Sequence, residues 1–409
     1  MENKKRDFIW NLIGTSINSF NSLFFMIVIN HINLKSEAGV FTYAYSLICL
    51  FFILATFYNR VYQISKSDKF SSKDFILYRV LSSIFTVIIV FLFSIINGYN
   101  LFKLSVIMLI CLFRMIEAIS DAVYGVLQYN GYLYKSGISL SLKGIIGLIG
   151  FTLVDYFTKS ITLALVSLII LNLAFFYFYD YKNVKEYLSG KASFNNILLI
   201  LKETLPIFIY SFLAMYVANI CKYMLDYFDT VEAQNIFGII FMPSTVIGLW
   251  SAYIVVPIIT SLNDLLKKKK YKEFNKLVSK MMIILVGVGV VAIIGAYILG
   301  IPVLNILYGM DLSDYKNLLL LVLVGATFYT LANVYSQVLV LLNVHKMQTL
   351  IYIVMSIVST LICYFLISSY KLSGSVYSYV IFMFILLILY LILYFYTLIK
   401  RRNEESVWK

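Results

Sequence analysis

The sequence predicts an all-α polytopic membrane protein with about 12 transmembrane helices in two six-helix bundles. Hydrophobic residues make up 61% of the 409 residues and charged residues only 13%, whereas a soluble domain has roughly 25% charged residues. Long apolar runs recur along the whole chain, most of them close to the ~20 residues that cross a hydrocarbon core of ~30 Å. Basic residues also concentrate in every second connection between these runs, as expected for alternating cytoplasmic and outer loops.

The apolar runs predict twelve spans in order. They cover residues 8–30, 38–58, 76–97, 104–127, 136–155, 161–179, 204–228, 236–262, 281–300, 317–341, 348–370 and 377–399. The basic start MENKKRDFIW precedes a long run that contains Asn and Ser and lacks an A-x-A cleavage site. We therefore interpret the first run as a retained span and not as a cleaved signal peptide.

Lys and Arg set the expected orientation. With a cytoplasmic N-terminus, about 25 of the 33 basic residues fall in inner segments and about five in outer loops. The remaining three, Arg114, Lys143 and Lys222, lie inside spans. This bias predicts an even number of spans with both termini in the cytoplasm. It also accounts for the net charge of +13 without a nucleic-acid partner.

A polar break divides the chain into halves. The segment Asp180–Lys202 is the longest polar connection, and it predicts an N-terminal bundle over residues 1–190 and a C-terminal bundle over residues 191–409. SEAGVF (residues 36–41) follows the first span and EAQNIF (residues 232–237) follows the seventh. A similar offset with the same topology indicates a weak parallel repeat.

The segment Lys267–Met282 alternates lysines with Tyr271, Phe274, Leu277 and Val278. Two interpretations remain open. It forms an amphipathic helix on the inner leaflet, held by anionic lipid, or it is a plain basic loop that fixes topology.

Motifs for catalysis and metal binding are missing from the sequence. The four cysteines fall in expected spans without CxxC spacing, and the only histidines, His31 and His345, have no partner spacing. We expect no metal site and no cofactor. The chain also lacks a G-x-x-x-x-G-K-[ST] motif, so we expect transport driven by a gradient, the membrane potential or a partner.

The span over residues 104–127 carries Arg114, Glu117 and Asp121. Spacings of three and four place them on one helix face, and each charge in hydrocarbon costs roughly 2.5 to 3.5 kcal/mol. The face must therefore meet protein or a water-filled path. Either Arg114 binds an anionic group while a carboxylate serves ion coupling, or Arg114 and Glu117 neutralise each other as an i,i+3 pair.

The interpretation of three further basic residues depends on their depth in the membrane. Lys143 lies as far after the Tyr129–Tyr134 turn as Asp121 lies before it, which predicts a structural Asp121–Lys143 pair. Arg60 and Arg79 lie where the second and third spans meet the cytoplasm. They attract an anionic substrate at the inner mouth, or they are ordinary anchors at the membrane edge.

Polar stripes mark two other spans. Asn11, Thr15, Asn18 and Ser22 follow one face of the first span; they line a hydrophilic cavity or bond to neighbouring helices. Asn219, Lys222 and Asp226 repeat the three-then-four spacing in the seventh span. Lys222 lies near the outer end, so that a cavity role and snorkelling to the interface both remain open.

The Glu117-x-x-x-Asp121 spacing leads into DAVYGVLQ (residues 121–128). Together with the turn at residues 36–41 and two six-span halves, it resembles polysaccharide flippases, the lipid-linked oligosaccharide exporters of the multidrug/oligosaccharidyl-lipid/polysaccharide superfamily. The resemblance implies a transporter and not an enzyme, with two bundles that form a V around a central cavity and alternate access. It implies movement of an undecaprenyl-pyrophosphate-linked O-antigen or capsule repeat unit, as in lipopolysaccharide or capsule biosynthesis, across a bacterial cytoplasmic membrane.

The resemblance also implies roles for residues. Positive charge for the substrate would come from Arg114, Lys143 and Lys222, with Arg60 at the entry. Polar lining would come from Asn11, Asn18 and Asn219, and coupling to H⁺ or Na⁺ from Glu117, Asp121 and Asp226. Expected partners are the lipid-linked oligosaccharide, membrane lipids, a polysaccharide polymerase and glycosyltransferases.

The first span lacks the rich arginine cluster of lipid II flippases, which favours surface polysaccharide as the product. A multidrug or cation antiporter on the same scaffold is the first alternative, and it would need a net acidic cavity. A polytopic polymerase or glycosyltransferase is the second. It would need a large outer loop or an acidic loop motif, and the sequence has neither.

Overall fold

The computed structural model describes residues 2–57, 60–268, 270–342 and 344–406. Almost all of them are helical. The chain forms two compact units, Met1–Met215 and Tyr216–Lys409, and we describe each by itself.

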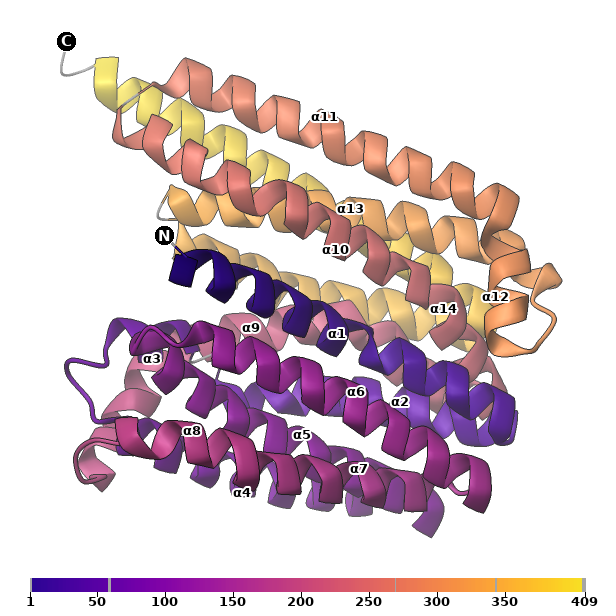
Figure 1. Cartoon of the computed structure of the whole chain (residues 1–409). Coiled ribbons are helices and arrows are strands. Elements are labelled where there is room, and N and C mark those ends of the chain that lie inside the picture. The colour runs from indigo at the N-terminus through magenta and orange to yellow at the C-terminus, as the bar shows by residue number, and fades with distance from the viewer. Residues whose placement is uncertain (1, 58–59, 269, 343, 407–409) are drawn as a thin grey trace. The chain divides into compact units, whose positions relative to one another are not determined.

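The first unit contains seven long helices and a short one (Figure 1). They are α1 (Glu2–Ile32), α2 (Lys35–Thr56), the short α3 (Arg60–Ser65), α4 (Ser72–Ile96), α5 (Leu101–Tyr129), α6 (Leu133–Thr158), α7 (Ile161–Phe175) and the first part of α9 (Phe194–Phe228). Between α7 and α9 the chain forms the π-helix η1 (Phe176–Tyr181), α8 (Lys182–Val184) and η2 (Lys185–Tyr187).

The second unit continues from the end of α9. Its elements are α10 (Val231–Lys267), α11 (Tyr271–Gly295), η3 (Ala296–Gly300), α12 (Ile301–Tyr308), η4 (Ser313–Tyr315), α13 (Lys316–Leu341) and α14 (His345–Ser406). Non-helical backbone at Lys371 divides α14 into two helices.

The helices confirm the expected multi-pass membrane protein. In the described residues, nine helical segments are long and apolar enough to cross a membrane. One of the nine is α14, which counts as two spans because of its break at Lys371. The charge-bearing α5 and the long α10 complete the twelve expected spans.

Two expected boundaries were wrong. Helix α9 begins at Phe194 and not at residue 204. Helix α11 begins at Tyr271, so residues 267–282 do not form a separate interfacial helix; Lys269 lies outside the described residues. Phe274, Val278 and Met281 are buried, and the apolar face of this segment packs inside the protein instead of on a lipid surface.

Helix α1 lies closely along α6 (Figure 1). A Cβ atom at Gly14 would lie 2.3 Å from the carbonyl oxygen of Gly137. Only glycine at both positions allows this approach of the two backbones, a common device in membrane helix packing. The contact fixes the position of α1 against α6.

The first half of α9 packs on the connection between α2 and α4. Phe208 stacks on Phe57 with ring centres 4.3 Å apart. Glu203 accepts hydrogen bonds from Tyr62 at 2.5 Å and Lys69 at 2.7 Å. Burial and the bond to Glu203 both raise the pKa of Tyr62, which keeps this phenol protonated as a donor. The division between the units therefore falls within α9, after this packed half.

Candidate functional site

A cavity of about 410 Å³ lies inside the first unit. This volume is within the roughly 300–1,000 Å³ typical of ligand sites. Its lining comes from the five helices α1, α2, α5, α6 and α7 and from the first residue of α3. The lining residues are Thr15, Asn18, Asn21, Phe52, Thr56, Arg60, Phe113, Arg114, Glu117, Ser120, Asp121, Tyr124, Leu140, Lys143, Gly144, Leu168 and Asn172.

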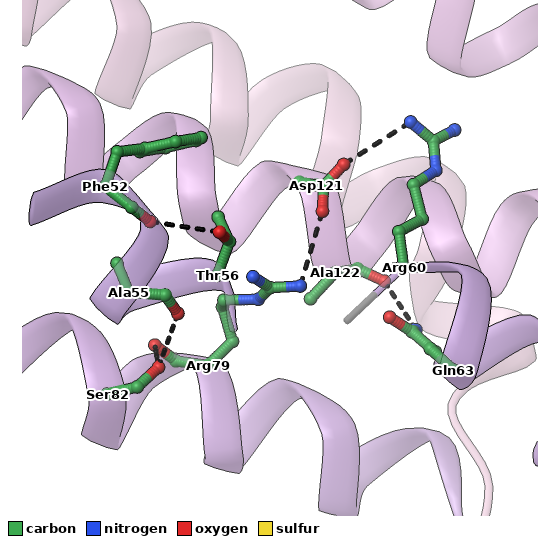
Figure 2. A network of polar contacts seen from close by, with 9 residues as sticks. All are labelled: Phe52, Ala55, Thr56, Arg60, Gln63, Arg79, Ser82, Asp121 and Ala122. Carbon is green, nitrogen blue, oxygen red and sulfur yellow. Dashed lines mark hydrogen bonds and ion pairs between the residues drawn. The ribbon is translucent and has the colours of Figure 1, made fainter. Parts of the chain in front are cut away.

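One carboxylate in this lining serves two guanidinium groups (Figure 2). Asp121 of α5 accepts from Nη1 of Arg60 at 3.3 Å and from Nη2 of Arg79 at 3.3 Å. Each arginine uses a different carboxylate oxygen. The Asp121 and Arg60 side chains are about a quarter exposed, whereas Arg79 is 1% exposed.

Neighbouring contacts hold the three elements in place. The Gln63 side chain donates to the carbonyl of Ala122 at 2.9 Å, which docks α3 on α5 (Figure 2). Gly125 leaves room for that amide, because a Cβ there would lie 2.6 Å from it. Ser82 donates to the carbonyl of Ala55 at 2.6 Å and ties α4 to α2.

A second charged pair is more deeply buried. Lys143 of α6 pairs with Asp180 of η1, and it also donates to Ser120 Oγ at 2.7 Å. Ser139 donates to the other Asp180 oxygen at 2.6 Å. Because Ser139 uses its proton there, the Tyr124 hydroxyl is the donor in its 2.8 Å contact with Ser139. Lys143 lies 3.5 Å from that hydroxyl, which closes a ring of polar contacts.

The third pair joins Arg114 and Glu117 of α5. The Arg114 guanidinium also lies 4.1 Å from the centre of the Phe52 ring, a cation–π contact with α2. The predicted i,i+3 neutralisation is therefore confirmed. Both residues nevertheless line the cavity, so that the pair also forms part of its wall.

The predicted Asp121–Lys143 pair is wrong. The two residues lie on adjacent helices, as expected, but Lys143 contacts Ser120 and Asp180. Asp121 follows Ser120 by one residue, and one residue rotates a helix face by roughly 100°. Asp121 consequently turns toward α3 and α4.

Arg60 and Arg79 differ in their positions relative to the cavity. Arg60 lines the cavity. Arg79 is not an exposed anchor, because it is buried against Asp121. Its helix begins at Ser72, and Arg79 therefore lies two turns inside α4.

The polar stripe of α1 faces the cavity in part. Thr15 and Asn18 line it, together with Asn21, while Asn11 is outside its lining. Asn219, Lys222 and Asp226 lie on α9 in the second unit. The ammonium group of Lys222 lies 4.9 Å from the centre of the Phe241 ring.

Sequence reasoning missed Asp180, Asn21 and Asn172. Asp180 was assigned to a polar connection because lysines follow it. The aromatic run FYFYDY around it indicates a membrane-embedded position instead, and Asp180 is 1% exposed.

The site has a small surplus of positive charge. Its basic members are Arg60, Arg79, Arg114 and Lys143, and its acidic members are Glu117, Asp121 and Asp180. In formal charge, four cations face three anions. A cavity with a small cationic surplus can hold an anionic group inside a membrane, where an unpaired charge would otherwise cost several kcal/mol.

Comparisons with known proteins agree with this description. The chain is 24% identical over 396 residues to the capsular polysaccharide biosynthesis protein CapF of Staphylococcus aureus, covering 96% of this chain and 98% of that protein. No protein-family model matches the sequence.

Solved structures share the fold at low identity. The lipid II flippase MurJ in an inward closed conformation has a TM-score of 0.74 at 14% identity, covering 94% of this chain and 87% of MurJ. An inward-facing multidrug resistance MATE transporter of the MOP superfamily has a TM-score of 0.72 at 11% identity, covering 97% and 99%. These likenesses show that the chain shares the fold of these two proteins.

Proposed function

We propose that this chain is a flippase for surface polysaccharide biosynthesis. In this proposal it moves an undecaprenyl-pyrophosphate-linked oligosaccharide from the inner to the outer leaflet of a bacterial cytoplasmic membrane by alternating access. The observation that carries it is the cavity in the first unit, whose lining holds three basic side chains and two acidic ones. CapF, by its name, acts in capsular polysaccharide biosynthesis, and MurJ is a flippase for lipid II.

The physical argument concerns the head group. A pyrophosphate with attached sugars cannot cross hydrocarbon unaided, because each unpaired charge or hydroxyl costs several kcal/mol there. Arg60, Arg114 and Lys143 offer cationic contacts to the phosphates. Asn18, Asn21 and Asn172 offer donors and acceptors to sugar hydroxyls.

Coupling and partners extend the proposal. We place H⁺ or Na⁺ coupling on Glu117, Asp121 or Asp226, and we expect a polysaccharide polymerase and glycosyltransferases beside the chain. Both termini are proposed to lie in the cytoplasm, since the inner segments hold most of the lysines and arginines.

A multidrug or cation antiporter is the second candidate, because the MATE transporter matches almost as well as MurJ. The charge of the cavity favours the flippase. A cationic drug needs a surplus of acidic side chains, and the three carboxylates here are each paired with a basic group.

The test uses a strain that lacks this chain and keeps the rest of its polysaccharide pathway. We expect lipid-linked repeat units to accumulate on the inner leaflet and the wild-type chain to restore export. At matched expression, Arg114→Ala should reduce export at least tenfold, whereas the exposed control Lys185→Gln should restore it fully. Single units that reach the outer leaflet without polymerising would refute flipping, and normal export by Arg114→Ala would leave Arg114 as half of a structural pair.

A further inference from the structure

The shared carboxylate of Asp121 is an unusual arrangement for two arginines. Charge-assisted N–H···O bonds are normally about 2.7–2.9 Å long and often bidentate for arginine. Here each guanidinium makes a single contact of 3.3 Å, to a different oxygen of Asp121. One negative charge thus faces two positive charges through two long contacts.

Arg79 adds donors that lack acceptors. Its Nε and Nη1 atoms are buried and have no hydrogen-bond partner among the described residues, and the same holds for Nε of Arg60. A buried donor that makes no hydrogen bond carries the full cost of its lost hydration, more for a charged group than for a neutral one. These three nitrogen atoms can therefore donate to oxygen atoms of a ligand.

The donors are close to the cavity. In Figure 2 the Arg79 guanidinium lies between Thr56 and Asp121, and both of these residues line the cavity. Arg60 lines it as well, and its side chain is about a quarter exposed. An oxyanion that enters the cavity can reach both guanidinium groups if the carboxylate of Asp121 moves aside.

We infer that Asp121 is an exchangeable internal counter-ion in a di-arginine site, and that Arg60 and Arg79 bind an oxyanion of the diphosphate class in its place. The empty cavity is then stable because Asp121 neutralises the arginines. The loaded cavity gains because a diphosphate offers several oxygens, enough for the N–H groups that Asp121 leaves without acceptors. Asp121 sets the affinity as a competitor, and it favours release of the anion after transport.

This inference rests on the proposed function for the source of the anion, but its test is a binding measurement. The full chain is purified in lipid nanodiscs and titrated with inorganic diphosphate by calorimetry. Asp121→Asn removes the competing charge and should bind diphosphate about tenfold more tightly than wild type. Arg79→Lys loses the fork of donors and should bind about tenfold more weakly. The exposed control Lys185→Gln should match wild type.

Unchanged or weaker binding by a folded Asp121→Asn protein overturns the inference and leaves Asp121 as a structural residue. If that variant fails to fold, Arg60→Gln replaces it: about tenfold weaker binding supports the site, and wild-type affinity refutes it. A short prenyl diphosphate titrated beside inorganic diphosphate separates the sources. Tighter binding of the prenyl compound supports a lipid-linked ligand, and equal affinity overturns that part and leaves a site for a free anion.

The two proposals fail in different ways. If export depends on the chain but substitutions of Asp121 and Arg79 do not change diphosphate affinity, the counter-ion exchange is refuted and the flippase proposal stands. The expected affinity changes in a chain that does not restore export refute the flippase and leave the anion site.

Discussion

The Lys143–Asp180 pair gives the sharpest test of the structure. The Lys143 side chain is 7% exposed and that of Asp180 is 1% exposed, and removal of one partner from such a pair typically costs about 3–5 kcal/mol. Asp180→Asn keeps the size of the side chain and an acceptor for Ser139, and Lys143 keeps its contact with Ser120. We therefore expect a loss near the lower end, about 3 kcal/mol of unfolding free energy.

The double variant Lys143→Met with Asp180→Asn removes both charges. It should recover about 2 kcal/mol relative to Asp180→Asn alone, since no buried charge is left unpaired. Unfolding is followed by circular dichroism in mixed micelles as the denaturing detergent is increased. Lys185→Met with Glu186→Gln makes the same charge change at exposed positions and should stay within about 0.5 kcal/mol of wild type. A double variant no more stable than Asp180→Asn would refute the pairing.

Three further predictions concern packing. Gly137→Ala should destabilise the chain by about 1–3 kcal/mol, because its Cβ would lie 2.3 Å from the backbone of Trp10. The control is Gly287→Ala, whose new Cβ meets nothing within 4 Å. Thermal unfolding compares the two variants, and equal stability would contradict the prediction. Phe208→Ala should cost roughly 2–3 kcal/mol of unfolding free energy through the lost stack on Phe57. Glu203→Gln should cost no more than about 1 kcal/mol, because the pair of Glu203 with Lys69 is partly exposed. A larger loss for Glu203→Gln than for Phe208→Ala in detergent unfolding would refute this prediction. The Sγ atoms of Cys221 and Cys363 lie 3.6 Å apart, and a copper–phenanthroline oxidant should join them in a disulfide after an approach of about 1.5 Å. Peptide mass spectrometry detects this disulfide, and Cys363→Ser should abolish it. An oxidised wild-type chain without the disulfide would argue against this contact between α9 and α14.

The spans could be predicted because the bilayer leaves few choices. Any segment that crosses ~30 Å of hydrocarbon needs about 20 apolar residues. The basic residues of the connections indicate on which side of the membrane each connection lies. Helix ends beyond the membrane carry no such pattern. Helix α9 thus extends past Glu203 and Lys202 to Phe194, and α11 extends through lysines to Tyr271.

The site was predictable in composition more than in pairing. The spacing of Arg114, Glu117 and Asp121 placed all three in the interior, and all three line the cavity. Depth along a helix also follows from counting residues, which brought α5 and α6 together near Lys143. The direction around the helix axis decides the partner, however, and a shift of one residue from Ser120 to Asp121 changes it by roughly 100°.

One local pattern could have corrected the pairing. Ser71 and Asp74 form a capping box at the start of α4, a signature that is visible in the sequence as Ser-x-x-Asp. With the helix start at Ser72, Arg79 lies roughly 10 Å inside it at ~1.5 Å per residue, too deep for an edge anchor and in need of an acidic partner. Asp121 on the neighbouring α5 supplies that partner. Lys143 then lacks a counter-charge, and the next carboxylate inside an aromatic run is Asp180. Because each buried charge requires a partner, assigning Asp121 to Arg79 leaves Asp180 as the counter-charge of Lys143.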